Sequence, residues 1–272
     1  MDEQLLDQAA VLLARAEHVC ALTGAGVSAE SGVPTFRGAH GLWEGLRAEQ
    51  VATPEAFVSN PPLVWKFYNW RRELLADVRP NSGHVALASM ETILPRFDLI
   101  TQNVDGLHQA AGSRNVVELH GNLWHVRCVA CSHERRTAGE KLPAEPRCPD
   151  CGDWLRPGVV WFGELLPADA LDAARRATDA CDVMLVVGTS AVVQPAASMA
   201  DWARQHGAEV IEINPEVTPL SSRATICLVG VSGQVLPRLL DRLQTRTDPP
   251  STGQPHNSNP DGVTRGTPDG NG

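Results

Sequence analysis

The chain lacks an excess of basic residues. It has 272 residues, and 23 lysine and arginine residues stand against 32 aspartate and glutamate residues, a formal net charge of −9. Non-specific binding to nucleic acid requires a positively charged surface, so we expect no stable nucleic acid binding. No apolar run reaches the roughly 20 residues of a membrane span, and the N-terminal MDEQLLDQAA lacks the pattern of a secretion signal. We therefore expect a cytoplasmic protein without membrane partners.

The last part of the chain lacks residues that build a core. From Arg246 onward Val263 is the only aliphatic residue, and proline, glycine, serine and asparagine are frequent. Such a segment cannot bury enough apolar surface to offset the entropy lost on ordering. We predict a disordered tail at 246–272 after a folded part at 1–245, which has room for one large domain with a modest insertion.

Short apolar segments alternate with helical patterns through the folded part. Continuously apolar strands between helices are typical of a parallel sheet covered on both faces. We predict a Rossmann-like α/β fold with strands near 18–26, 97–105, 115–121, 182–190, 208–215 and 225–230. The large part would comprise about 1–37, 91–121 and 158–245. A small lobe would be built from two insertions, a helical stretch at 38–90 and a turn-rich cysteine segment at 122–157.

Four of the seven cysteines form two closely spaced pairs. Cys128 and Cys131 are followed, after sixteen residues, by Cys148 and Cys151. This spacing predicts two knuckles around one tetrahedral Zn²⁺, and four thiolates leave no position for a reactive water, so the metal would be structural. An iron site or two redox dithiols are the alternatives. The remaining cysteines lie in apolar stretches and are interpreted as buried small hydrophobic residues: Cys20, Cys181 and Cys227.

A glycine turn follows the first predicted strand. The segment Gly24-Ala25-Gly26-Val27-Ser28-Ala29 fits the pattern G-x-G-x-x-G/A and opens a predicted helix. Glycine permits a tight turn and lets the backbone approach a pyrophosphate at a helix N-terminus. The acidic residue expected about twenty positions later is not clear, and Glu44 is a weak candidate. An ordinary glycine turn is the alternative.

Polar side chains follow two later strands at the ends where α/β sheets place catalytic loops. His120 ends the strand near 115–119 and is a candidate general base because its ordinary pKa is near neutral. The loop TQNVDGLH at 101–108 contributes Asn103 and Asp105, which are suited to binding a carboxamide. A structural histidine and a simple loop-capping role are the alternatives.

These motifs together resemble one known family. GAGVSAESGVPTFRG at 24–38, TQNVDGLH, ELHG, the four cysteines, VVWFGE, GTS and the Ile-Asn pair at 213–214 occur in the order seen in sirtuins, over about residues 5–245. Sirtuins are NAD-dependent protein-lysine deacylases. The resemblance implies NAD and one structural Zn²⁺ as cofactors and acyl-lysine proteins as partners. The expected products are free lysine, nicotinamide and 2'-O-acyl-ADP-ribose.

The resemblance also implies residue roles. Its catalytic residues would be His120 and Asn103. The substrate peptide would pair by strand addition with the segment that contains Val159, Trp161, Phe162, Gly163 and Glu164. NAD would contact residues of the glycine loop, the 101–108 loop and the ends of later strands: Gly24, Ala25, Gly26, Ser28, Phe36, Arg37, Gln102, Asn103, Asp105, Gly188, Thr189, Ser190, Asn214, Glu216 and Ser232.

One departure from the common sirtuin pattern bears on which acyl group is removed. Many sirtuins have aspartate where this chain has Thr35, and threonine there resembles the class that removes acidic acyl groups. That class also has Tyr-x-x-Arg in the small lobe, as Tyr68 and Arg71 do here. Residues at i and i+3 share one helix face, and arginine binds a carboxylate bidentately. We predict a desuccinylase and demalonylase with weaker deacetylase activity, in which Tyr68 and Arg71 bind the acyl carboxylate.

Several alternatives to this prediction remain open at this point. Tyr68 is a packed residue and Arg71 a surface ion-pairing residue in the first alternative, and Arg72 takes the place of Arg71 in the second. At the level of function, the alternatives are a general deacetylase, a protein ADP-ribosyltransferase and a zinc-ribbon binding module without catalysis.

Overall fold

The computed structural model describes residues 2–34 and 42–247 of the chain. The predicted site residues Phe36 and Arg37, the Thr35 position and the segment 248–272 lie outside the described residues. Within the described part, no helix is long and apolar enough to cross a membrane.

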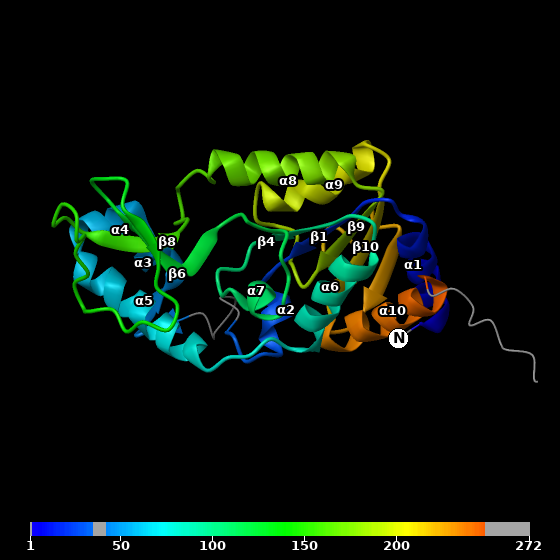
Figure 1. Ribbon diagram of the computed structural model, residues 1–272, viewed down its shortest axis with the longest axis horizontal. Helices are drawn as coiled ribbons and strands as arrows, with labels where there is room; N and C mark the ends of the chain where they lie inside the picture. Colours follow the sequence, from blue (N-terminus) through cyan, green and yellow to red (C-terminus); the bar gives the residue numbers. More distant parts are fainter. Residues whose placement is uncertain (1, 35–41, 248–272) are drawn as a thin grey trace, which may run out of the picture.

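A six-stranded parallel sheet forms the large part of the molecule (Figure 1). The pairing order is β11-β10-β9-β1-β4-β5. All residues of β1 and β9 are buried, which explains why these strands are continuously apolar. The strands are β1 (Val19–Thr23), β4 (Phe97–Thr101), β5 (Val116–Glu118), β9 (Val183–Val187), β10 (Glu209–Asn214) and β11 (Ile226–Val229).

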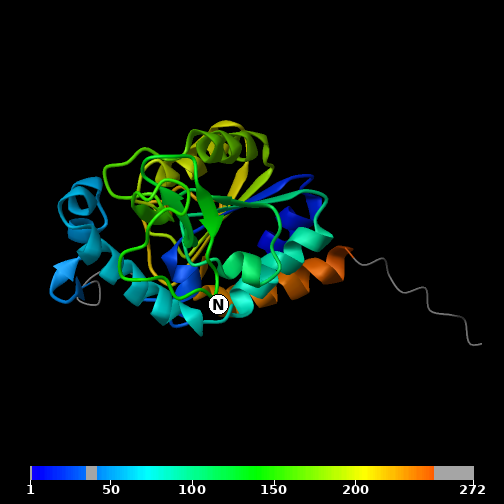
Figure 2. The same cartoon turned by 60° about the vertical axis from the view of Figure 1, so that its left-hand side comes forward.

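Helices cover both faces of this sheet, as predicted. On one face, α1 (Glu3–Arg15), α6 (Ser82–Ile93) and α10 (Ser232–Thr247) share a core with Val19 and Ala21 of β1. On the other face, α8 (Ala168–Ala180) and α9 (Met199–Gln205) share a core with Cys20 and Leu22. Figures 1 and 2 show α6 and α10 side by side below the sheet. Three short helices complete this part: α2 (Ala25–Ala29), α7 (Leu107–Ala110) and η2 (Ala196–Ser198).

A smaller lobe lies at the opposite end of the molecule from α1 and α10 (Figure 1). Its three-stranded antiparallel sheet has the order β7-β6-β8. Its core is separate from that of the large sheet and includes Trp65, Phe67, Leu123 and Val126. The lobe contains β2 (Leu42–Trp43), β3 (Leu46–Arg47), α3 (Ala48–Val51), α4 (Pro54–Ser59), α5 (Pro61–Ala76), β6 (Gly121–Cys128), β7 (Glu134–Arg136) and β8 (Leu155–Val159).

Helix α5 shows how local sequence sets one boundary of this lobe. The Asn60 side chain accepts a hydrogen bond from the N–H of Leu63 at 3.1 Å, and Pro61 occupies the first helical position, where its missing N–H has no consequence. The helix buries Trp65 and Tyr68 in the lobe core. Asn60 is therefore the N-cap of α5.

Three predicted boundaries differ from the structure. The helical stretch at 38–90 was assigned to the small lobe, but Ala86, Leu87 and Met90 of α6 belong to the core of the large part. Helical periodicity does not show which core a helix packs against, so this difference was hidden in the sequence. The strand β6 begins at Gly121 and runs into the predicted cysteine segment as far as Cys128. Helix α10 continues to Thr247, one residue past the predicted start of the tail.

Candidate active site

The glycine turn packs against the end of β9. A side-chain Cβ at Gly26 would lie 2.7 Å from the Gly188 carbonyl oxygen, and one at Gly24 would lie 2.8 Å from the Thr189 Cβ. The Gly24 and Gly26 N–H groups donate to the carbonyls of Val187 and Gly188 at 3.1 and 2.8 Å. Close packing of two loops therefore requires glycine here, in addition to the predicted approach of a pyrophosphate.

The weak acidic candidate for this fingerprint is wrong. Glu44 lies in the turn between β2 and β3 of the small lobe and is ion-paired with Lys66 at 2.9 Å on the surface. It is separate from the large sheet, where a ribose-binding acid of this fold would stand.

Buried polar groups gather beside the glycine turn. The Asn103 side-chain amide donates to the Gly24 carbonyl and to the Ser28 hydroxyl, both at 3.1 Å. Ser28 in turn donates to Asp105 at 2.7 Å. All three side chains are buried. The structure thus brings together Ser28, Asn103 and Asp105, as the sequence predicted.

Two histidines that the sequence did not mark as site residues also belong to this group. His84 is fully buried, and its Nε2 lies 3.3 Å from the Ser28 hydroxyl. His84 and His108 stack with ring centroids 4.9 Å apart. Burial lowers the pKa of both histidines, and that of His108 to about 3. His108 stood within the TQNVDGLH motif, whereas His84 gave no local signal beyond its place three residues after the helix-capping Asn81.

His108 has a defined tautomer. Thr23 donates its hydroxyl hydrogen to Thr101 at 2.8 Å, so its oxygen accepts the hydrogen bond from His108 Nε2 at 2.9 Å. His108 is therefore a neutral Nε2–H donor, and its buried Nδ1 has no partner among the described residues. With a pKa of about 3, this histidine stays neutral at neutral pH.

His120 is oriented for proton transfer. Its Nδ1 lies 2.9 Å from the Gln102 carbonyl oxygen, and since a carbonyl only accepts, Nδ1 carries the hydrogen and Nε2 has a lone pair. Burial lowers the pKa of His120, while the Gln102 carbonyl raises it. A neutral, half-buried imidazole with an unprotonated Nε2 is suited to act as a general base at neutral pH.

Other predicted cofactor residues lie at or just after the ends of β4, β9 and β10 and at the start of α10. The Gln102 amide donates to the Thr189 hydroxyl at 3.0 Å, and Asn214 donates to the Thr189 carbonyl at 2.6 Å. Glu216 is exposed beyond β10. Ser232 begins α10 and donates to Glu30 at 3.4 Å. These contacts place Gln102, Thr189 and Asn214 in one row. Ser232 contacts Glu30, which the sequence did not mark as a site residue.

The structure separates the two neighbouring arginines of α5. Arg72 is buried in the small lobe and donates to the carbonyls of Leu123 and Thr137, each at 2.8 Å. It is a structural residue, so the alternative in which Arg72 binds the acyl group is wrong. Arg71 is half-buried, and its guanidinium lies 5.9 Å from the centre of the Tyr68 ring.

Tyr68 and Arg71 influence one another electrostatically. Burial raises the pKa of Tyr68 to about 12, while the charge of Arg71 and the indole N–H of Trp161 act in the opposite direction. Burial lowers the pKa of Arg71, and Tyr68 and Asp105 oppose that change. A phenol and a guanidinium therefore share a desolvated environment near Asp105.

The predicted peptide-binding segment continues from an edge strand. Among the described strands, β8 pairs on one side only, with β6. Val160 donates to the His120 carbonyl at 2.9 Å, which fixes this segment beside the histidine. Phe162 is 52% exposed, in a position to contact another molecule. The Glu164 carboxylate instead binds Arg156 at 2.6 and 2.8 Å, so its side chain shapes the segment from within.

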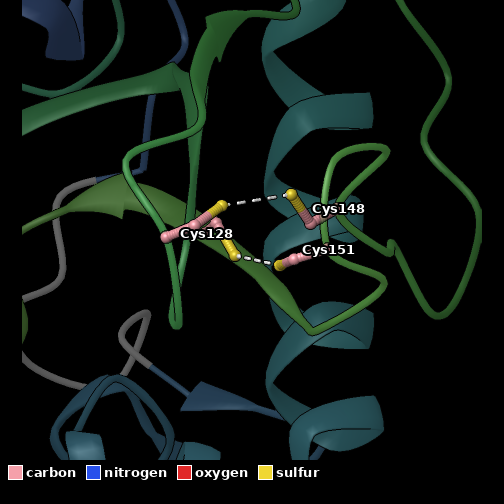
Figure 3. A group of neighbouring side chains, drawn as sticks. Cys128, Cys148 and Cys151 are labelled. Carbon is pink, nitrogen blue, oxygen red and sulfur yellow. Dashed lines mark hydrogen bonds between the residues drawn. The ribbon is translucent and has the colours of Figure 1, made fainter.

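The four paired cysteines converge in the small lobe (Figure 3). Their sulfur atoms all lie within 4.8 Å of one another. The contacts between pairs are Cys128 to Cys151 at 3.5 Å and Cys131 to Cys148 at 3.6 Å. Four thiolates at about 2.3 Å from a tetrahedral zinc stand about 3.8 Å apart, whereas a disulfide requires about 2.05 Å. The cluster fits one structural zinc, and the cysteines are not disulfide-bonded.

The parallel sheet, the glycine turn and the oriented histidine define a nucleotide-cofactor enzyme of the α/β class with a zinc-binding lobe. Its relationships identify the family. The chain belongs to the Sir2 family, whose family model matches residues 24–195.

Similar proteins support this assignment. The chain is 52% identical over 230 residues to a protein of Aquifex aeolicus named NAD-dependent protein deacylase, covering 84% of this chain and 96% of that protein. A crystal structure described as a Sir2 homologue–NAD complex has a TM-score of 0.84 and 49% identity, covering 91% of this chain and 96% of that one. A Sir2 homologue mutant in complex with 2'-O-acetyl ADP ribose has a TM-score of 0.85 and 49% identity, covering 92% and 100%.

Proposed function

We propose that this protein removes acyl groups from protein lysines with NAD as co-substrate, and that it prefers succinyl and malonyl groups to acetyl groups. The observation that carries the activity is the orientation of His120. Its Nδ1 is bound to the Gln102 carbonyl at 2.9 Å, and its Nε2 is left unprotonated.

The residues present fit NAD. The row formed by Gln102, Thr189 and Asn214 would face the ribose and adenosine side, and Asn103 and Asp105 would bind the nicotinamide carboxamide. The relative bound to NAD has the same fold at 49% identity. When bound, NAD supplies an electrophilic ribose carbon to which the acyl oxygen adds as nicotinamide leaves.

His120 then acts as the base. Its unprotonated Nε2 would take up the proton of a ribose hydroxyl when the co-substrate is bound. The Gln102 carbonyl holds the ring in place, because rotation of the imidazole would break the 2.9 Å contact. Transfer of the acyl group to the ribose agrees with the 2'-O-acetyl ADP ribose bound by the second relative.

The acyl preference follows from Tyr68 and Arg71. A guanidinium and a phenol in a desolvated environment bind a carboxylate more strongly than they bind a methyl group, since a hydrogen bond to a charged group contributes roughly 1.5–3 kcal/mol. The substrate peptide would add as a strand to the edge that continues from β8, and Phe162 would contact it. The zinc would stabilise the small lobe without taking part in the chemistry.

The test is mass spectrometry of the products formed from acetyl-, succinyl- and malonyl-lysine peptides with NAD. The proposal requires free lysine, nicotinamide and O-acyl-ADP-ribose, with faster turnover of the acidic acyl groups. ADP-ribose attached to the protein target, without loss of the acyl group, would instead establish an ADP-ribosyltransferase. Equal rates on all three peptides would leave a deacylase without acidic-acyl preference.

A further inference from the structure

The indole of Trp161 has an unusual environment. The residue is 3% exposed, and its Nε1–H makes no hydrogen bond of ordinary geometry with any described residue, although the Tyr68 hydroxyl is near. An indole nitrogen only donates, and leaving a buried donor unpaired opposes folding. Native structures contain few such groups, and one beside a binding site is explained when a ligand accepts its hydrogen bond.

The ring is held rigidly. The guanidinium carbon of Arg156 stacks 3.4 Å from the ring centre, and the Phe57 ring packs against it at 5.1 Å between centroids. The Trp161 backbone N–H donates to Glu164 at 2.8 Å, and Glu164 is bound to Arg156 through both carboxylate oxygens. The direction of the indole N–H is therefore set before any substrate arrives, which lowers the entropy lost on binding.

The N–H lies near the Tyr68 hydroxyl. It is near enough to the Tyr68 hydroxyl to favour the phenolate, as Arg71 does. The adjacent residue, Val160, donates to the His120 carbonyl at 2.9 Å. An indole N–H, a phenol and a guanidinium thus lie near one another, from Trp161, Tyr68 and Arg71.

We propose that the Trp161 indole N–H is a specificity-determining donor that binds the distal carboxylate of an acidic acyl group together with Tyr68 and Arg71. This inference rests on the proposed function, because it requires that a succinyl- or malonyl-lysine enters the site. A carboxylate has two oxygens and about four acceptor positions, enough for all three groups. An acetyl group ends in a methyl group and leaves the N–H unpaired.

The experiment compares Trp161→Phe, which keeps an aromatic ring and removes the N–H, with wild-type protein. The quantity measured is the ratio of kcat/KM on a succinyl-lysine peptide to that on the matching acetyl-lysine peptide. We expect this ratio to fall about tenfold or more, the effect of one hydrogen bond to a charged group. The matched control is Trp154→Phe. Trp154 also stacks under an arginine, Arg147, at 3.7 Å, and its replacement should leave the ratio within about twofold.

The outcomes separate the two proposals. If wild-type protein prefers succinyl-lysine and Trp161→Phe keeps that ratio, the role of Trp161 is refuted while the proposed function stands. Equal losses on both peptides would show a structural tryptophan and refute it as well. A wild-type protein without any preference would overturn the acyl preference and, with it, this inference.

A second measurement does not depend on the variant's folding. Wild-type protein with ¹⁵N-labelled tryptophan has seven indole signals at most, because the chain has seven tryptophans. One signal should shift more on addition of succinyl-lysine peptide than on addition of acetyl-lysine peptide, without NAD. If the two peptides shift every indole signal alike, Trp161 does not bind the carboxylate.

Discussion

Replacing Arg72 with methionine should lower the unfolding temperature of the small lobe. Replacing its neighbour Arg71 should lower that temperature much less. Arg72 is 5% exposed and connects α5 to β6 and to the segment after β7. Methionine has a similar stem and no donors, so the change removes hydrogen bonds with little change in packing volume.

The magnitude follows from the bonds that are lost. The two shortest join the Arg72 guanidinium to the Leu123 and Thr137 carbonyls at 2.8 Å each. A hydrogen bond from a charged donor contributes roughly 1.5–3 kcal/mol, so these two give a lower estimate of about 3 kcal/mol. For a chain of this size each kcal/mol corresponds to about 2–4 °C in Tm. We therefore expect a fall of at least about 6 °C.

The assay is thermal unfolding followed by circular dichroism, with Arg71→Met as the matched control. Arg71 is half-buried at the edge of the site, so its replacement should lower the Tm by less than half as much. A Tm of Arg72→Met within about 2 °C of wild type, or a larger fall in Arg71→Met, would refute the assignment of the two arginines.

Four further predictions concern the site and the lobe. His120→Ala should keep the fold and lower turnover about 10²–10⁴-fold. Because burial lowers the pKa of His120 below its ordinary 6.5 in the free protein, the acid limb of the wild-type kcat/KM profile should lie below pH 6.5. Near wild-type turnover of the variant, or a limb above pH 7, would contradict this. Arg71→Met should lower kcat/KM on succinyl-lysine about ten- to a hundredfold with a much smaller change on acetyl-lysine, and equal losses would indicate a structural arginine. Cys148→Ser should lower the zinc content below one per chain and the Tm; metal analysis that finds no zinc in wild-type protein would disprove the assignment. His108 has a pKa of about 3 in the folded protein and an ordinary value near 6.5 in the unfolded chain. Between these pH values only the unfolded chain binds the extra proton, so the free energy of unfolding should fall as the pH drops through that window. Urea unfolding at pH 7 and pH 5 should show a smaller fall in the free energy of unfolding for His108→Gln than for wild type.

Much of the fold and part of the site could be predicted because the signals are local. The buried strands β1 and β9 are apolar at every position, and that pattern needs no knowledge of their partners. The paired cysteines specify their own ligand geometry within one segment. The polar residues after β4, Asn103 and Asp105, meet Ser28 because parallel strands carry their following loops to the same edge of the sheet.

What remained hidden depends on contacts between distant segments. The alternation of helices predicted α6 but not that it packs on the large sheet beside α10. His84 joins Ser28 across 56 residues of sequence, and no local pattern marks such a meeting.

The sequence by itself determined the class of sheet, the four-cysteine cluster and the motifs of the family, because each is written in spacing along a single stretch of chain. The tertiary structure alone showed that Arg72, the alternative to Arg71, is a buried structural residue. Arg71 and Arg72 differ by about 100° around α5, and only the packing of that helix against β6 turns Arg72 into the lobe core, where it meets Leu123 and Thr137, and Arg71 toward Tyr68. A difference of one residue on a helix face cannot be resolved until the surface that the helix packs against is known.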